Sequence, residues 1–427
     1  MSFDLAPFGS LFSTPQKNGL TRPKSVRGSG VPMVNMNELF AFSRIHNIEM
    51  DLVPIVDKES HFLLETEDLL FARQSLVLAG AGKCSIFIGN TKPTVFESHI
   101  IRCRLNKTVS NPYFYYYFFQ SVHGRIVMET IAEQGAGASG IRGSDLVKLL
   151  VPCPSKSYQD AIVKILTPLD DRISLLRETN TTLEAIAKTL FKSWFVDFDP
   201  VKAKAEGRLP EGMDEATAAL FPSEFEESAL GLIPKGWSNV SLKEVVSIFD
   251  SQRVPLSGGD RAKRKGNYPY YGAASLMDYI DGYIFDGVYC LMGEDGSVAH
   301  ESGYPIMQYV WGKIWVNNHA HVLQGKNGIS TEHVMLSLQR TNIQPLITGA
   351  VQAKLSQGNM WRIVFLMPSR SIAEVFGEMI APLFTRIRHN FEKIQTLTTL
   401  RDTLLPRLIS GQLRLNQAQD LVYEVEA

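Results

Sequence analysis

Apolar residues recur in a heptad pattern along two long stretches of the chain. After Pro154, and again after Pro368, apolar side chains follow one another at alternating steps of four and three residues. This spacing forms a narrow stripe on a helix, of the kind that packs against one partner helix in a coiled coil. In the first stretch the stripe consists of Ile162, Leu166, Leu169, Ile173, Leu176, Asn180, Leu183 and Leu190. In the second stretch it consists of Phe376, Ile380, Leu383, Ile387, Asn390, Ile394, Leu397 and Leu404.

The two stretches are copies of one another, because the sequence matches itself without gaps at an offset of 214 residues over residues 135–194. Gly135-Ala136 falls on Gly349-Ala350, and Pro168-Leu169 falls on Pro382-Leu383. Any two amphipathic helices share an apolar spacing, but matched glycines and prolines carry no amphipathic information. An internal repeat therefore explains the match better than a chance similarity between two helices.

The natural partner of each helix is the other copy. Antiparallel pairing would place the domains that precede the helices at opposite ends of a bar about 55 Å long, since about 37 helical residues rise 1.5 Å each. A pseudo-twofold axis would relate the two halves. One asparagine interrupts each seam, and in an antiparallel pair Asn180 can face Asn390. We hypothesise that these amides meet and fix the register; two independent asparagines that face solvent are the alternative.

Each long helix follows a segment in which short β-branched and aromatic runs alternate with Gly, Pro and Asn, as in a twisted sheet with turns. The two segments are weakly similar. "FDLAPFGSLFST" resembles "VSLKEVVSIFDS", and "DLLFARQSLVLAGAG" resembles "DGVYCLMGEDGSVAH". Each segment is expected to end in a helix, the first capped by Asn111 before Pro112, the second beginning near Ser330.

We therefore predict an α+β chain with a pseudo-twofold internal repeat, in which two mixed α/β domains are separated by two long helices that form an antiparallel coiled coil. The acidic segment between the copies is punctuated by Pro and Gly, and we expect a connector draped over the domains. The expected boundaries are 1–153 for the first domain, 154–195 for the first helix, 196–235 for the acidic linker, 236–367 for the second domain, 368–415 for the second helix and 416–427 for a C-terminal tail.

Composition indicates a soluble protein in a reducing compartment. Hydrophobic residues make up 44% and charged residues 20% of the 427 residues, and no apolar run approaches the ~20 residues of a membrane span. The four cysteines stand singly, which favours free thiols over a disulfide framework. We expect a cytoplasmic protein without membrane contact. The net charge is only −1, but a basic cluster keeps local binding of nucleic acid open. The cluster consists of Arg261, Lys263, Arg264 and Lys265.

Motifs that mimic catalytic sites are incomplete. "LAGAGKCS" ends like a phosphate-binding loop, but Val77 and Cys84 replace the glycine and the hydroxyl that such a loop needs. "GAGASG" follows an expected helix, whereas a dinucleotide site follows a strand. "NPYF" resembles a methyltransferase motif without its second proline. His319 and His321 lack a carboxylate or cysteine at metal-ligand spacing. We expect no catalytic residues and no metal site.

Several segments resemble the specificity subunits of type I restriction-modification systems. The run from "LVPCPSKSYQDAIV" to "LGLIPKGW" looks like the central region of these subunits. "YPYYGAASLMDYIDGYIFDGVYCLMGEDGSV" and "WVNNHAHVL" are similar to one class of their target-recognition domains. "LTTLRDTLLPRLISGQL" resembles the end of their second helix. Order, spacing and the internal repeat agree with the layout of this family, which has two target-recognition domains and two helical conserved regions.

The resemblance implies a non-catalytic, sequence-specific DNA-binding subunit. Each target-recognition domain would read one half of a bipartite, asymmetric site in double-stranded DNA, and the helices would set the unread spacer. The helices would also bind two modification (methyltransferase) subunits, which carry S-adenosylmethionine, and restriction (translocase and nuclease) subunits, which use ATP and Mg, would join them. The chain itself would hold no cofactor. A stand-alone DNA adenine methyltransferase and a coiled-coil scaffold without DNA binding are the alternatives.

Base reading needs side chains that match donors and acceptors in the major groove, beside basic surface. In the first domain, the candidates are Arg73, Gln74, Ser75 and Lys83, in the loop after "DLLFA". In the second domain, they are Glu294, Asp295, Ser297, Asn317, Asn318 and His319, with the basic cluster on phosphates. For Arg73 and for the basic cluster, an ordinary solvated surface is the alternative.

Overall fold

The computed structural model describes residues 3–135, 138–229, 231–349 and 351–426, and it divides into two compact units. Unit 1 comprises Met1–Leu175 and Lys393–Ala427, and unit 2 comprises Leu176–Glu392. Each unit contains one of the two expected mixed α/β domains and a part of both long helices. Ala136 and Gly137 of the "GAGASG" segment, and Ala350 of the repeat, lie outside the described residues.

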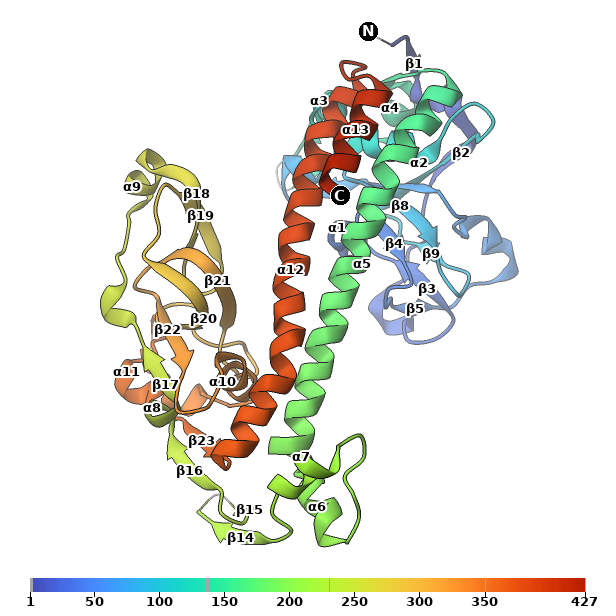
Figure 1. Ribbon diagram of the computed structural model, residues 1–427. Coiled ribbons are helices and arrows are strands. Elements are labelled where there is room, and N and C mark those ends of the chain that lie inside the picture. The colour runs from blue at the N-terminus through green and yellow to red at the C-terminus, as the bar shows by residue number, and fades with distance from the viewer. Residues whose placement is uncertain (1–2, 136–137, 230, 350, 427) are drawn as a thin grey trace. The chain divides into compact units, whose positions relative to one another are not determined.

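A five-stranded sheet lies at the centre of the domain in unit 1 (Figure 1). Its strand order is β2-β10-β6-β8-β4, in which β4 and β8 are parallel and the other neighbours are antiparallel. All four residues of the middle strand β6 are buried, as its unbroken apolar sequence requires. The strands are β2 (Phe12–Asn18), β10 (Ile100–Leu105), β6 (Leu69–Ala72), β8 (Cys84–Gly89) and β4 (Arg44–His46).

Smaller sheets and short helices complete this domain. The strands of the small sheets are β1 (Leu5–Pro7) with β13 (Leu150–Pro152), β5 (Leu52–Val53) with β3 (Val31–Val34) and β9 (Val95–Phe96), and β11 (Glu133–Gln134) with β12 (Ser139–Gly140) and β7 (Gln74–Ser75). The short helices are α1 (Met36–Ala41), α4 (Gly143–Lys148) and the 3₁₀ turns η1 (Phe8–Leu11), η2 (Lys24–Val26), η3 (Asp57–Phe62) and η4 (Leu78–Gly80).

The aromatic run after Asn111 forms two helices where the sequence predicted one. The Asn111 side chain accepts a hydrogen bond from the backbone N–H of Tyr113 at 3.0 Å and caps α2 (Pro112–Gln120), which confirms the expected start. The helix is interrupted at Ser121. The hydroxyl of Ser121 caps α3 (Val122–Glu129) by accepting a hydrogen bond from the N–H of Gly124 at 3.1 Å. A Cβ on Gly124 would lie 2.0 Å from a carbonyl oxygen of α2, so the break needs a glycine there.

A six-stranded sheet forms the domain in unit 2, with the order β17-β22-β20-β21-β18-β19. Its strands are β17 (Val246–Ile248), β22 (Ala320–Gly325), β20 (Phe285–Gly293), β21 (Met307–Val316), β18 (Lys265–Tyr271) and β19 (Leu276–Ile280). β16 (Ser238–Ser241) and β23 (Val364–Met367) form a separate pair. The helices are α8 (Leu242–Val245), α9 (Gly258–Lys263), α10 (Thr331–Leu338) and α11 (Gln357–Met360), with 3₁₀ turns η5 (Asp250–Gln252) and η6 (Gln344–Leu346).

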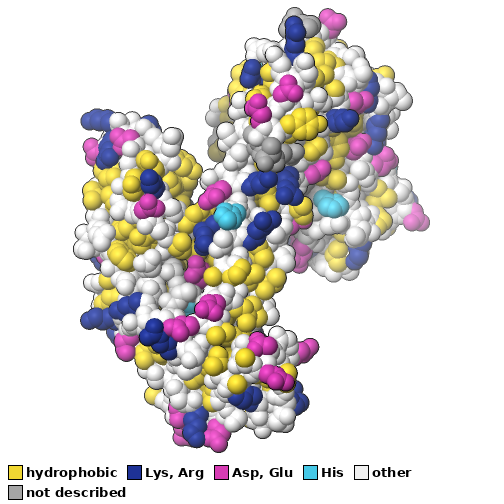
Figure 2. Space-filling view, viewed as in Figure 1, with side chains coloured by type: hydrophobic (Ala, Val, Ile, Leu, Met, Phe, Trp, Pro, Cys, Tyr) yellow, Lys and Arg dark blue, Asp and Glu magenta, His cyan; other side chains and the backbone are white. Residues whose placement is uncertain are grey.

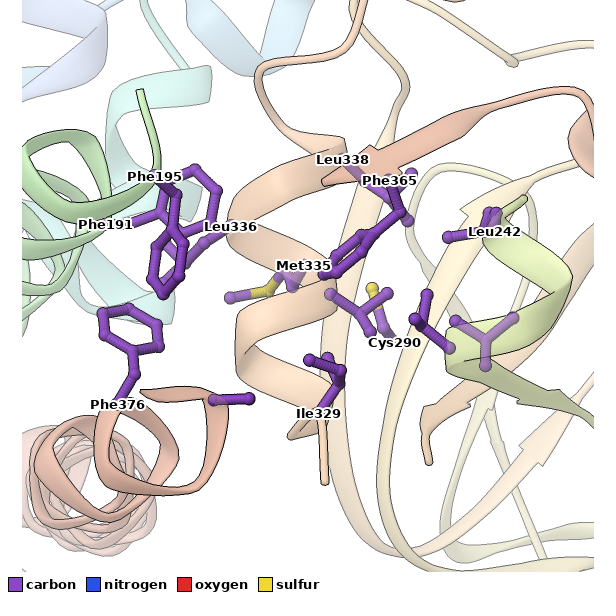
Figure 3. Close-up of a cluster of buried hydrophobic side chains, with 14 of the residues drawn as sticks. Phe191, Phe195, Leu242, Cys290, Ile329, Met335, Leu336, Leu338, Phe365 and Phe376 are labelled. Carbon is purple, nitrogen blue, oxygen red and sulfur yellow. The ribbon is translucent and has the colours of Figure 1, made fainter. Parts of the chain in front are cut away.

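Helix α10 joins this sheet to the long helices within unit 2. Ser330 caps it, which confirms the expected start, by accepting from the N–H of His333 at 3.1 Å. Figure 3 shows Met335 and Leu336 of α10 between Cys290 of the sheet and Phe376 of a long helix. One continuous apolar core therefore holds the sheet, α10 and the helix pair of this unit together.

The connector between the copies is folded, contrary to the expectation of a segment draped over the domains. It forms α6 (Asp199–Ala205), α7 (Glu215–Leu220) and the hairpin of β14 (Phe225–Ser228) and β15 (Gly231–Pro234). Val201, Phe221 and Ile233 are buried in the core of unit 2. These buried apolar residues anchor the segment, whereas other apolar residues of it, such as Leu209 and Leu232, are exposed.

The two long helices are α5 (Lys156–Phe195) and α12 (Arg370–Ile409). Both their starts and their ends are 214 residues apart, as the repeat predicted. Within each unit, segments of the two helices lie side by side in opposite directions (Figure 1). In unit 2, for example, Asn180 contacts Asn390 while Phe191, further along α5, contacts Phe376, which is earlier in α12.

The two asparagines meet, which confirms the hypothesis drawn from the heptad phase. The amide of Asn390 donates to Oδ1 of Asn180 at 2.7 Å, and Asn180 donates to the carbonyl oxygen of Ile387 at 3.3 Å. Both side chains are buried. The other seam residues are buried too, except Leu183, Leu190 and Leu383, which are half-buried.

The end of the chain in unit 1 differs from the expected tail. α12 ends at Ile409, before Gly411, whose positive φ of 70° is typical of a residue that follows a helix. The chain then forms α13 (Leu415–Glu426), and Leu413 and Ala418 are buried. Among the described residues, the helices that are long enough to cross a membrane are too polar to do so.

Candidate nucleic-acid interface

The candidate residues of unit 1 lie at the end of the central strand β6. Gln74 and Ser75 form β7, a short strand that pairs with β12, where the sequence predicted a loop. Arg73 precedes it, and its carbonyl oxygen accepts from the N–H of Ile141 at 2.9 Å. Gln74 is exposed, whereas Arg73 and Ser75 are half-buried. The three residues are thus held together at one edge of the domain.

Lys83 is bound within its own domain. Its ammonium group donates to the carbonyl oxygen of Phe40 at 2.8 Å and lies 5.1 Å from the centre of the Phe40 ring. Burial lowers the pKa of Lys83, because the charged form loses water there. These contacts leave its predicted role as a DNA contact without structural support.

Three members of the basic cluster in unit 2 are held by ion pairs and aromatic rings. Arg261 lies 5.1 Å from the Tyr270 ring centre and Arg264 lies 4.9 Å from that of Trp315. Arg264 also forms an ion pair with Asp281 at 2.8 Å. Arg261 and Lys265 both form ion pairs with Asp278, at 3.5 Å and 2.6 Å respectively. Lys263 is exposed and forms no ion pair with a described residue. Of the four, Lys263 therefore fits the predicted phosphate contact best.

Two segments of unit 2 bring most of the other candidates together. Glu294, Asp295 and Ser297 follow β20, and residues 317–319 form the turn between β21 and β22. The backbone N–H groups of Glu294 and Asp295 donate to the carbonyl oxygen of His319 at 2.8 and 3.3 Å, which joins the two segments. The ring of His319 lies 3.5 Å from the carboxylate of Asp295.

The candidates differ in exposure. Asn318 and Ser297 are exposed, and the side chain of His319 is 43% exposed. Asn317 is 4% exposed, and its Oδ1 accepts from the N–H of His319 at 2.8 Å. Asn317 therefore shapes the turn, and its burial gives no support to the predicted base contact.

Arg253, which sequence reasoning missed, binds both segments. Its guanidinium group donates to Glu294 at 2.7 Å and to the carbonyl oxygen of Ala320 at 2.6 Å, and it lies 3.4 Å from the carboxylate of Asp250. The side chain of Arg253 is only 11% exposed. No sequence motif marks this residue, because its partners Glu294 and Ala320 lie 41 and 67 positions away along the chain.

His321 completes this polar cluster. Its side chain is fully buried, with Nδ1 at 2.6 Å from Asp250 and Nε2 at 2.9 Å from the carbonyl oxygen of Leu355. Asp250, Glu294 and His321 place ligand atoms within 4.8 Å of one another, a set of donors that could in principle hold a metal ion. Arg253 pairs with both carboxylates, however, so ion pairs inside the domain account for the cluster.

Charge on the visible surface is mixed. Figure 2 shows Lys and Arg side chains interspersed with Asp and Glu rather than gathered in one basic area.

Comparisons with known proteins agree with the duplicated architecture. The model of the type I restriction modification DNA specificity domain matches the chain twice, at residues 25–185 and 234–399. The specificity subunit of the type I restriction enzyme HindI from Haemophilus influenzae is 26% identical, in an alignment 371 residues long that covers 72% of this chain and 79% of the relative. The MjaIX specificity subunit of Methanocaldococcus jannaschii is 25% identical over 313 residues, 71% of this chain and 69% of the relative.

A solved structure shares the fold. The S subunit of a type I restriction-modification system from M. genitalium aligns over 96% of both chains, with a TM-score of 0.56 and 16% sequence identity.

Proposed function

The chain belongs to the family of type I restriction-modification DNA specificity subunits, and from this membership we propose that its two domains read the two halves of a bipartite, asymmetric DNA site. Specificity subunits are non-catalytic and recognise DNA for methyltransferase and restriction partners. The family match favours this function over the stand-alone methyltransferase and the scaffold.

The observation that carries the proposal is the repeat of one plan with two different sheets. The plan runs from a mixed domain into a 40-residue helix, and it occurs twice at an offset of 214 residues. The sheet of the first domain has five strands and that of the second has six. Domains that differ in this way present different side chains to DNA, so the two half-sites would differ in sequence.

The proposed base contacts are the accessible candidates. In the first domain these are Gln74, with Arg73 and Ser75 beside it. In the second domain they are Asp295, Ser297, Asn318 and His319. Lys263 is proposed to contact phosphate, while Arg253, Glu294 and Asn317 fix the shape of the reading surface.

We assign the helices to spacing and partner binding. Equivalent positions of the two copies carry the same exposed residues, Arg172 with Arg386 and Thr189 with Thr403. Two equivalent faces suit two copies of one partner, and we propose that these are two modification subunits. The modification subunits would bring S-adenosylmethionine, and restriction subunits that use ATP and Mg would join the complex. A cytoplasmic location would give the complex access to DNA.

The test is to assemble the chain with its modification subunits and map the methylated bases in random DNA. We expect methylation at one bipartite sequence with a fixed spacer, and modification subunits alone should show no such preference. Methylation of the same sites without the chain, or an unchanged site when the HindI specificity subunit replaces it, would contradict the proposal.

A further inference from the structure

Both domains carry a similar hairpin beside the end of the central strand. In unit 1, β11 and β12 form the hairpin, with Gln134 opposite Ser139, and β12 pairs with β7 so that Gly140 lies opposite Gln74. In unit 2, the described residues of segment 348–355 form a similar hairpin, whose pairing is shifted by one residue relative to that of unit 1. Thr348 and Lys354 exchange hydrogen bonds of 2.9 and 2.7 Å, and Lys354 forms a bridge to Asp295.

The repeat shows that these hairpins are equivalent. At the offset of 214 residues, Gly140 falls on Lys354, and these residues lie opposite Gln74 and Asp295. One position further along, the N–H of Ile141 donates to Arg73 at 2.9 Å, and the N–H of Leu355 donates to Glu294 at 2.8 Å. Arg73 and Gln74 are thus the counterparts of Glu294 and Asp295.

This equivalence corrects the sequence comparison of the two segments. Matching "DLLFARQSLVLAGAG" with "DGVYCLMGEDGSVAH" at equal length places Arg73 on Leu291. The structure places Arg73 on Glu294 instead, because the central strand of unit 2 has nine residues and that of unit 1 has four. The candidates that were chosen separately in the two domains therefore occupy the same site.

A glycine shapes the hairpin in unit 2. Gly349 has a φ of +93°, and a Cβ on this residue would lie 2.0 Å from the carbonyl oxygen of Gln352. At the equivalent place in unit 1, the N–H of Gly135 donates to the carbonyl oxygen of Ala138 at 2.9 Å. The requirement for glycine is therefore strict in unit 2, whereas a Cβ on Gly135 would lie 3.2 Å from the carbonyl oxygen of Ala138.

We propose that these hairpins form a second wall of each reading surface, and that Gln352 reads an adenine of the second half-site in the major groove. The inference rests on the proposed function. Gln352 is exposed, and its amide donates to the Asp295 carboxylate at 2.9 Å, which orients the side chain. The amide oxygen and the second N–H then remain for the N6 and N7 atoms of adenine, the pair that glutamine recognises.

The backbone holds this side chain next to the other candidates. The N–H of Gly296 donates to the carbonyl oxygen of Ala353 at 2.9 Å, so the hairpin and the segment after β20 are joined on both sides of Asp295. The Asp295 carboxylate lies between Gln352 and His319. Such fixed geometry is what discrimination between bases requires, because a mobile amide would accept several bases.

The first domain lacks this side chain, which makes the proposal specific to one half-site. The residue equivalent to Gln352 is Ala138, which is exposed but has no side-chain donor or acceptor. A change at Gln352 should therefore alter the sequence read by the second domain alone.

The experiment uses the complete complex with its modification subunits and measures methylation rates on DNA randomised in both half-sites. We expect Gln352→Ala to lower the preference for adenine at one position of one half-site by about 5- to 100-fold. The other half-site should be read as before. Gln344→Ala, which removes an exposed glutamine in η6, is the matched control and should leave every preference unchanged.

Gln352→Met serves as a second variant, because it keeps the length of the side chain without its amide. Both variants should weaken the preference for adenine at the same position of the same half-site. If preferences stay unchanged at every position, or if both variants weaken methylation of all sequences equally, the reading role of Gln352 is wrong. If the unmodified complex itself shows no bipartite preference, the proposed function fails, which is a different result.

Discussion

His333 on α10 is a histidine held in an aromatic enclosure. The rings of Phe195 and Phe376 lie 4.5 and 5.0 Å from its own, and its Nδ1 has no hydrogen-bond partner among the described residues. Burial lowers the pKa of His333 to about 3, because a charged imidazole would lose its water there. The folded chain therefore keeps this ring neutral in ordinary buffers.

The pKa of His333 predicts a loss of stability in mild acid. The unfolded chain binds a proton at this residue below pH 6.5, whereas the folded chain does so only near pH 3. The free energy of unfolding should therefore fall between these limits, by about 2 kcal/mol from pH 7.5 to pH 5.0. His333→Leu should lack this part of the decrease in urea denaturation, whereas the exposed control His389→Leu should follow the wild type. Equal decreases in wild type and His333→Leu would contradict the assignment.

Residues that act through local chemistry could be predicted from the sequence. Asn111 caps α2 because its side chain reaches an N–H two residues ahead. Arg253 and Lys83 could not be predicted in this way, because the fold alone brings Glu294 to the one and the Phe40 carbonyl to the other. The structure brings the predicted segments of each domain together, and their contact with DNA stays a prediction; the roles of single side chains depend on tertiary contacts that the sequence does not show.

At the scale of elements, the paired asparagines are the feature that the heptad phase predicted best. Periodicity identifies the seam, and two polar interruptions are enough to suggest a register. The connector shows the limit of this reasoning. Its acidic composition concealed Phe221 and Ile233, which are too widely spaced to form a pattern but are buried in the core.

The asparagine pair also allows a test of the seam in unit 2. Asn390→Leu should lower the free energy of unfolding by about 1–3 kcal/mol, because the buried amide of Asn180 loses a partner. The double variant Asn180→Leu/Asn390→Leu should recover most of this loss, since neither polar group remains. Chemical denaturation of the single and double variants measures the coupling, with the exposed Thr189→Leu as the control. Additive losses in the double variant would show that the two amides do not interact.

At the scale of the whole molecule, the helices predict a dependence of the recognised spacer on their length. Adding one heptad to α5 after Leu175 and one to α12 after Glu392 keeps the seam in phase. Each helix then grows by about 10 Å, the rise of about three base pairs. Methylation mapping should show a longer spacer between unchanged half-sites.

An insertion of three residues in each helix is the control for this design, because it moves the apolar stripe out of phase and should impair assembly. An unchanged spacer with the heptad insertions would contradict the assignment of spacing to the helices.

Each mixed domain also begins and ends at one place. β1 opens the first domain and pairs with β13, the strand just before α5, and β16 pairs in the same way with β23 just before α12. Neighbouring strands lie about 5 Å apart. The points at which the chain enters and leaves each domain are therefore close together. A domain taken from a relative could replace either domain by being joined to the chain at these two paired strands. Such cassettes offer a direct route to new combinations of half-sites without redesign of the remaining chain.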